Sequence, residues 1–153
     1  MLRVFTIGLL FCALFSTSAK AQVTGSILLP EANEGTIVDI QGGGDFTGSP
    51  RFATGLSFPT AVCQGPGGHI YVSEAGSGEV TIVTGGGDFT NTPPFATGLS
   101  SPFGLHCSDT EILVTENTTS QITDITSGGD VSGTTPLAVV ANPSDVFLSL
   151  IHI

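Results

Sequence analysis

The sequence has very little positive charge. It contains 3 Lys and Arg residues against 13 Asp and Glu residues, a formal net charge of −10 at pH 7. After residue 21 the only Lys or Arg is Arg51. Nucleic acid phosphates and anionic lipid headgroups are bound mainly by Lys and Arg. The composition therefore excludes a nucleic-acid-binding protein and argues against a protein that binds anionic membrane surfaces.

Motifs of the common catalytic classes are also missing. The sequence has no Gly-x-Ser-x-Gly, no phosphate-binding glycine loop and no pair of histidines at metal-ligand spacing. It therefore gives no support for serine hydrolysis or phosphoryl transfer. No apolar pattern of helical period extends over three turns after residue 21, so we expect almost no helix there.

Residues 1–21 have the pattern of a secretory signal peptide. Arg3 supplies a positive charge, residues 4–15 are nearly all apolar, and Ala19-Lys20-Ala21 has the small-x-small pattern of a cleavage site. We expect cleavage before Gln22 and a secreted or periplasmic location. All 13 acidic residues follow that point, so the exported chain has a formal net charge of 1 − 13 = −12.

Glycine is abundant, and it occurs in an internal repeat. Residues 42–59 and 85–102 are identical at 14 of 18 positions, and a more divergent copy follows at 128–143. Three aspartates after glycine runs, Asp45, Asp88 and Asp130, mark a repeat length of 43 and then 42 residues. A repeat of this length indicates a repeat architecture.

Each complete repeat contains four short β-type segments. They are predicted at 60–64, 69–74, 79–84 and 95–97, and again at 103–107, 111–116, 121–126 and 137–140. Earlier strands are expected at 36–40 and 52–54, with 26–29 either a strand or a lead-in, and a new first strand at 145–148. Four strands in about forty residues is typical of a β-propeller blade. We therefore predict an all-β fold of four-stranded antiparallel blades, about 59–99 and 102–141, in an incomplete ring.

Two segments resemble a known repeat family. Leu56-Ser-Phe-Pro-Thr-Ala-Val62 with Gly68-His-Ile-Tyr-Val-Ser-Glu74, and Leu99-Ser-Ser-Pro-Phe-Gly-Leu105 with Ile112-Leu-Val-Thr-Glu116, are similar to NHL-type repeats. The resemblance is to secreted bacterial six-bladed propellers, including ScyD/ScyE-like proteins, and covers about residues 35–146. It implies a propeller fold and leaves function open.

The expected organisation has four parts. Residues 1–21 are the signal peptide, 22–34 a lead-in, 35–148 the NHL-like repeats, and 149–153 a non-native truncated end that departs from the repeat. Residues 35–148 hold two whole blades and parts of two more, fewer than a ring needs. Either several copies assemble or the sequence is truncated, and we expect truncation.

Glu74 and Glu116 are the candidate metal ligands. They occupy matching positions at the ends of successive second strands. Two such carboxylates could face one central opening and bind Ca²⁺, with Asn117 and Asp109 as further oxygen ligands. The alternative is that the glutamates hydrogen-bond neighbouring turns, and we favour that interpretation, so no cofactor is predicted.

The remaining polar candidates are interpreted as structural. Asp45, Asp88 and Asp130 are expected to cap turns. His106 and Cys107 are adjacent in a strand and point to opposite faces, which argues against a catalytic pair. Cys63 corresponds to His106 rather than to Cys107, and packed sheets lie about 10 Å apart. A disulfide needs Cα atoms within about 7 Å, so we expect Cys63 and Cys107 to remain unpaired.

Two functions from different classes fit the sequence. The first is a binding or scaffolding propeller that holds a ligand or protein partner. The second is a metal-dependent lactonase- or lyase-like enzyme with a metal in the central channel. Carboxylates are supplied by two repeats only, so a binding module is expected and the enzyme remains the alternative.

Overall fold

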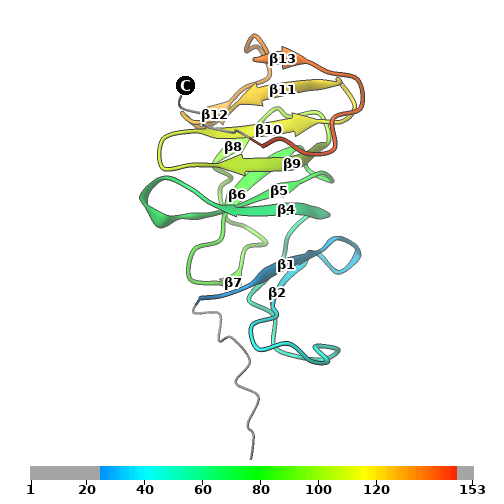
Figure 1. Ribbon diagram of the computed structural model, residues 1–153, viewed down its shortest axis with the longest axis vertical. Helices are drawn as coiled ribbons and strands as arrows, with labels where there is room; N and C mark the ends of the chain where they lie inside the picture. Colours follow the sequence, from blue (N-terminus) through cyan, green and yellow to red (C-terminus); the bar gives the residue numbers. More distant parts are fainter. Residues whose placement is uncertain (1–24, 148–153) are drawn as a thin grey trace, which may run out of the picture.

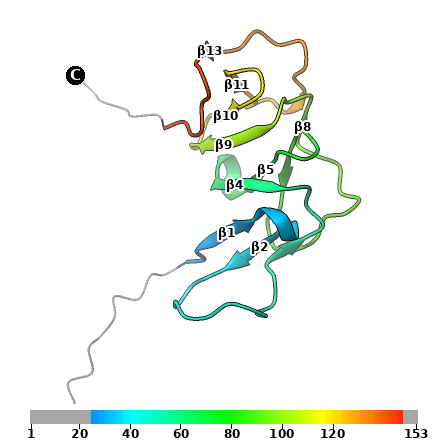
Figure 2. The same ribbon diagram turned by 90° about the vertical axis from the view of Figure 1, so that its right-hand side faces the viewer.

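The computed structural model describes residues 25–147, and this part of the chain is all-β (Figures 1 and 2). Its only helices are single 3-10 turns at Ala32–Glu34 and Pro66–Gly68. The predicted near absence of helix is confirmed for these residues. The predicted signal peptide and the predicted non-native end at 149–153 lie outside the described residues. No helix of the described part is long and apolar enough to cross a membrane.

The strands form three sheets that follow one another along the chain. In the first sheet the order is β1 (Leu28–Glu31), β2 (Thr36–Asp39), β3 (Ala53–Thr54) and β7 (Gly87–Asp88). In the second it is β4 (Pro59–Gln64), β5 (Ile70–Glu74), β6 (Glu79–Ile82), β8 (Ala96–Thr97) and β12 (Gly129–Asp130). In the third it is β9 (Pro102–Cys107), β10 (Ile112–Glu116), β11 (Gln121–Asp124) and β13 (Ala138–Val139).

Neighbouring strands pair antiparallel through short hairpins, as the repeat predicts. β5 pairs with β4 on one side and with β6 on the other, and β10 pairs with β9 and β11 in the same way. The sheets stack in chain order, the second between the other two (Figure 1). Antiparallel sheets of four main strands are therefore confirmed for the two complete repeats.

Two predicted boundaries are wrong. The apolar run before Pro30 was expected to end there, but β1 continues to Glu31 and pairs with β2. Proline is tolerated because β1 is an edge strand. The new first strand predicted from Asp145 is not formed within the described residues, since 145–147 pair with no strand.

The core lies between the sheets rather than inside one of them. Side chains of the first two sheets form one buried cluster, with Ile37, Ala53, Leu56, Val72 and Val83. The second and third sheets enclose the other, which includes Tyr71, Val80, Ala96, Leu105, Ile112, Val114 and Ile125. Successive β5 residues point to opposite faces, so Tyr71 joins one cluster and Val72 the other. The second sheet is therefore buried on both faces.

The repeated glycine stretch joins neighbouring sheets. No strand is predicted between residues 84 and 95, yet this part of the chain contains β7, which pairs in parallel with β3 of the preceding sheet. In the next repeat β12 pairs in the same manner with β8. Each repeat therefore contributes a short strand to the outer edge of the sheet before it. Sequence patterns cannot identify a two-residue strand whose partner lies in another repeat.

A glycine in each outer strand region makes room for this contact. Gly98 has φ +80°, and a Cβ there would lie 2.6 Å from Asp130 Oδ1 and 2.8 Å from Ser132 N. Gly55, one repeat earlier, would meet Asp88 Oδ1 at 2.6 Å. At both positions the aspartate turn of the next repeat packs directly against the glycine backbone.

We expect Gly98→Ala to lower the free energy of unfolding by about 2–4 kcal/mol. Roughly 1–2 kcal/mol comes from placing a Cβ at positive φ, and the rest from the clash with the aspartate turn. Gly129→Ala is the matched control, because Gly129 also has φ +80° but a Cβ there would meet nothing within 4 Å. Urea unfolding of both variants measures the difference, and equal losses would contradict the packing role.

A disulfide between Cys63 and Cys107 links the second and third sheets, so the prediction that these cysteines remain unpaired is wrong. Their Cα atoms are 5.8 Å apart, because β4 and β9 are the facing edge strands of neighbouring sheets and lie closer than whole sheets do. As predicted, the two thiols point to opposite faces of their own sheets. Because the sheets are stacked, Cys63 points from the second sheet toward the third, and Cys107 points from the third sheet back toward the second.

Candidate functional site

The two predicted metal ligands, Glu74 and Glu116, lie in separate sheets, each buried within its own set of hydrogen bonds. Their exposed fractions are 5% and 2%. Glu74 accepts from the backbone N–H of Ser57 at 2.6 Å and from the Thr81 hydroxyl. Glu116 accepts from the N–H of Ser100 at 2.6 Å and from the side chains of Thr119, Gln121 and Thr123.

These contacts give both glutamates a structural role. Ser57 and Ser100 lie in the segments that carry the chain from an outer strand to the next inner strand, just before Pro59 and Pro102. Each carboxylate therefore fixes one such crossing segment. No group of three or more His, Cys, Asp or Glu side chains suited to a metal occurs within residues 25–147. The favoured interpretation, that these glutamates hydrogen-bond neighbouring turns, is confirmed. Calcium binding is the untested alternative, which calcium titration would test.

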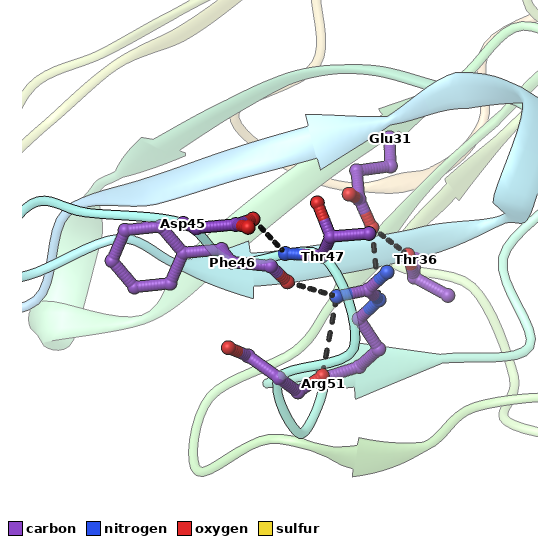
Figure 3. A network of polar contacts seen from close by, with 7 residues as sticks. Glu31, Thr36, Asp45, Phe46, Thr47 and Arg51 are labelled. Atoms are coloured by element: carbon purple, nitrogen blue, oxygen red, sulfur yellow. Dashed lines mark hydrogen bonds and ion pairs between the residues drawn. The ribbon is translucent and has the colours of Figure 1, made fainter.

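Glu31 is a third member of this series, which the sequence analysis missed. It precedes Glu74 by the repeat length of 43 residues and ends β1 as Glu74 ends β5. The repeat length alone could have identified it. Glu31 accepts from Thr36 Oγ1 at 2.7 Å and forms an ion pair with Arg51 Nε at 2.9 Å (Figure 3).

Arg51 connects Glu31 to the first aspartate loop. Its Nη1 donates to the carbonyl oxygens of Ser49 at 3.2 Å and Phe46 at 3.4 Å, beside the turn formed by Asp45 and Thr47 (Figure 3). The side chains of Arg51 and Glu31 are 25% and 30% exposed. An ion pair this accessible contributes at most about 1 kcal/mol.

The three repeat aspartates cap turns, as predicted. Asp45, Asp88 and Asp130 each accept from the backbone N–H two residues later, at 2.9–3.0 Å. Hydrogen bonds from the Thr90 hydroxyl and then its N–H lower the pKa of Asp88, and the equivalent donors of Thr47 lower the pKa of Asp45. For Asp130 the Ser132 N–H lowers the pKa most, followed by the Ser132 hydroxyl.

The histidines do not form a catalytic group with Cys107. His106 is half-buried on β9 and makes an edge contact with Phe147, at a ring-centroid distance of 6.1 Å. His69 is exposed, and its Nδ1 lies 3.3 Å from Thr84 Oγ1. The sulfur of Cys107 is bonded to Cys63, so it is not available as a nucleophile.

A cleft of about 530 Å³ lies between β1 and β4. Its lining comes from the first two sheets and consists of Gly25, Ser26, Leu28, Val62, Cys63, Gln64 and Ile70. None of these side chains is charged. Its walls combine the apolar side chains of Leu28, Val62 and Ile70 with polar groups such as Ser26 and Gln64. Its volume lies within the range of about 300–1,000 Å³ that is common for ligand clefts, so this cleft is the candidate binding site.

The cleft occupies the place of a missing strand. In the second and third sheets, β4 and β9 pair with one edge of β5 and β10. The corresponding edge of β1 pairs with no strand among residues 25–147.

A comparison with models of known protein families and with curated proteins finds no match to this sequence. The cleft and the free edge therefore have to be interpreted from their own chemistry.

Proposed function

We propose that the chain is an extracytoplasmic β-propeller module that binds an extended polypeptide beside β1, and that it acts by binding rather than by catalysis. Three antiparallel sheets in chain order, built on a repeat of 42–43 residues, support the propeller architecture. The NHL-type resemblance supports it too. The Cys63–Cys107 disulfide favours an oxidising compartment.

The observation that carries the proposal is the edge of β1, which pairs with no strand among residues 25–147 and lies beside an uncharged cleft. Exposed sheet edges bind peptides by adding a strand, with backbone hydrogen bonds for affinity and side-chain pockets for specificity. Leu28 lies on the edge strand and also lines the cleft, opposite Val62 and Ile70 of the second sheet. A polypeptide added to this edge would place apolar side chains in the cleft.

The register of β1 defines which backbone groups face the free edge. The N–H of Ile40 donates to the carbonyl of Ile27 at 2.8 Å, so Ile27 and Leu29 direct their backbone groups toward β2. Because the direction alternates along a strand, the N–H and C=O of Leu28 face away from β2, as does the C=O of Pro30. Pro30 has no N–H. The edge therefore offers one complete hydrogen-bonding residue, Leu28, and one additional acceptor.

The alternative enzyme would need carboxylates that are free to bind a metal. Glu74 and Glu116 are instead occupied by N–H and hydroxyl donors of the turns around them. No charged side chain lines the cleft between β1 and β4. These features favour noncovalent binding over metal-dependent hydrolysis or lyase chemistry.

Binding is tested with a labelled peptide that carries the sequence of β4, Pro59–Gln64, with serine in place of its cysteine. At nanomolar protein, fluorescence anisotropy should show saturable binding. Leu28→Pro should weaken it at least about 10-fold, because β1 loses its only N–H donor that faces away from β2 and gains a ring. Leu28→Val keeps the backbone groups and is the control. Absence of binding, or equal binding to Leu28→Pro, would refute the proposal.

A further inference from the structure

Phe58 is an exposed aromatic residue in a backbone conformation that suits smaller residues. It has φ +53° and is 48% exposed, and it belongs to neither of the two buried clusters. Ser101 and Asn142, which precede the corresponding prolines of the next two repeats, have φ +54° and +49°. Asn adopts positive φ comparatively often, whereas a bulky residue there is an outlier. The turn therefore requires positive φ, and the other repeats make it without an aromatic side chain.

Hydrogen bonds hold Phe58 in place at the end of the second sheet. The N–H of Ala75 donates to the carbonyl of Phe58 at 3.1 Å, and the N–H of Gly76 donates to the carbonyl of Ser57 at 3.0 Å. A Cβ on Gly76 would lie 2.5 Å from Ser57 Oγ, so the β5–β6 turn packs closely against the crossing segment. The second sheet lies between the other two (Figure 1). The exposure of Phe58 is therefore a feature of the middle of the stack.

Glu79, at the same end of the second sheet, also departs from the repeat. It stands directly opposite Glu74 in the β5–β6 pair. The equivalent residues of the other two sheets, Thr36 and Gln121, donate to the strand-end glutamate opposite them at 2.7 and 2.8 Å. An ionised carboxylate cannot donate in this way, and like charges directly opposite each other destabilise a sheet. Glu79 therefore weakens the sheet at a position where the other repeats strengthen it.

No cation of the chain compensates for the charge of Glu79. After residue 21 the only Arg or Lys is Arg51, which is paired with Glu31 in the first sheet. Within residues 25–147 the side chain of Glu79 takes part in no hydrogen bond or ion pair. Opposite residues of a sheet direct their side chains to the same face, and on that face Glu74 accepts from the N–H of Ser57. The Glu79 carboxylate therefore lies on the side where the crossing segment passes.

We propose that Phe58 and Glu79 form a binding site for an organic ammonium group, either a free amine or the end of a lysine side chain. The face of an aromatic ring attracts a cation, and the carboxylate supplies the opposite charge and a hydrogen-bond acceptor. The 13 acidic residues and one Arg after residue 21 also attract cations. The site lies at the opposite end of β4 from the cleft, which Val62 and Gln64 line, so it is independent of the peptide site.

The chemistry of the site suits an organic cation better than a metal ion. Ca²⁺ takes about six to eight oxygen ligands. The oxygens of Glu74 already accept from Ser57 and Thr81, which leaves the carboxylate of Glu79 alone at this end of the second sheet. Phe58 adds an apolar surface on which the carbon chain of an amine or a lysine can lie.

The two residues should be dispensable for stability, unlike residues that serve the fold. Phe58→Asn introduces the residue that the third repeat has before its proline, so the urea concentration at the unfolding midpoint should stay the same or rise. Glu79→Gln introduces the equivalent residue of the third sheet, Gln121, whose side chain donates to the strand-end glutamate. The midpoint of this variant should rise. A fall in either midpoint would assign that residue to the fold and contradict its binding role.

An NMR titration of the ¹⁵N-labelled protein tests the site with n-butylammonium chloride and with a tripeptide that has a central lysine. Both should shift the amide signals of Phe58, Ala75 and Gly76 in a saturable way, with a millimolar dissociation constant. Phe58→Asn and Glu79→Gln should each raise that constant at least about 3-fold, because each removes one electrostatic contact with the cation. Glu111→Gln is the matched control. Glu111 is also half-buried but lies at the opposite end of its sheet, so its loss should have no effect.

The two probes identify the source of the ammonium group. Tighter binding of the tripeptide supports a lysine of a polypeptide, and equal or tighter binding of n-butylammonium supports a free amine. The proposal is overturned by a lack of saturable shifts up to about 100 mM amine, by equal shifts with n-butanol or sodium chloride, or by unchanged binding to both variants. None of these results affects the peptide site at Leu28, which has its own probe and variant.

Discussion

Replacing Cys63 and Cys107 together by serine is expected to lower the free energy of unfolding by about 4 kcal/mol. The disulfide closes a loop of 44 residues, and loop-closure entropy of the unfolded chain predicts a stabilisation of this size. The bond also lies within the apolar cluster between the second and third sheets. Urea unfolding of the oxidised protein and the double variant measures the difference.

Reduction of the wild-type protein provides the control for this prediction. Reduced wild type and the serine variant should unfold at similar urea concentrations, because both lack the cross-link. A loss below about 1 kcal/mol in both would show that the two sheets are held together without the disulfide. A loss confined to the serine variant would point to the hydroxyl groups buried by the substitution.

The second large effect is expected at Glu116. Glu116→Ala removes the acceptor for the N–H of Ser100 and for the Thr123 hydroxyl, both in a site where the carboxylate is 2% exposed. A buried donor left unsatisfied costs about 1–3 kcal/mol. We therefore expect the free energy of unfolding to fall by about 3–5 kcal/mol, measured by urea unfolding.

Glu31→Ala is the matched control at the same repeat position. The side chain of Glu31 is 30% exposed, and its partners are the accessible Arg51 and the single hydroxyl of Thr36, so its loss should cost only about 1–2 kcal/mol. Glu116→Gln keeps the shape and one acceptor oxygen, and should fall between the two alanine variants. Equal effects of Glu31→Ala and Glu116→Ala would contradict the role of burial.

Sequence patterns predict the strands well where apolar and polar residues alternate over four or more positions. The strand Glu79–Ile82 alternates in this way, whereas the strands around Tyr71 and Leu113 are short continuous apolar runs that are buried on both faces. The pairing of Gly87–Asp88 with Ala53–Thr54 was not predictable in this way. Gly87 and Asp88 are both exposed, so they show no alternation of apolar and polar residues, and the strand that they pair with lies in the preceding repeat.

The candidate site was only partly predictable. The position of Glu74 and Glu116 in the repeat was read correctly, but their burial and their donors depend on the crossing segments at Ser57 and Ser100. The disulfide was missed because the Cys63 and Cys107 side chains point to opposite faces of their own sheets, and this was taken to keep them apart. In two stacked sheets, side chains that meet across the gap must point in opposite directions in this way. The cleft beside Leu28 depends on the lack, among residues 25–147, of an inner strand in the first sheet, which no residue pattern signals.

The most direct test of the account is amide hydrogen exchange at β1 with and without the β4 peptide. Peptide binding at the free edge should slow exchange of the Leu28 N–H at least about 10-fold. The N–H of Leu29, which already faces β2, should change little. Protection of Leu28 alone is the result that we predict. Unchanged exchange at Leu28 under saturating peptide, or protection confined to other strands, would contradict binding at this edge.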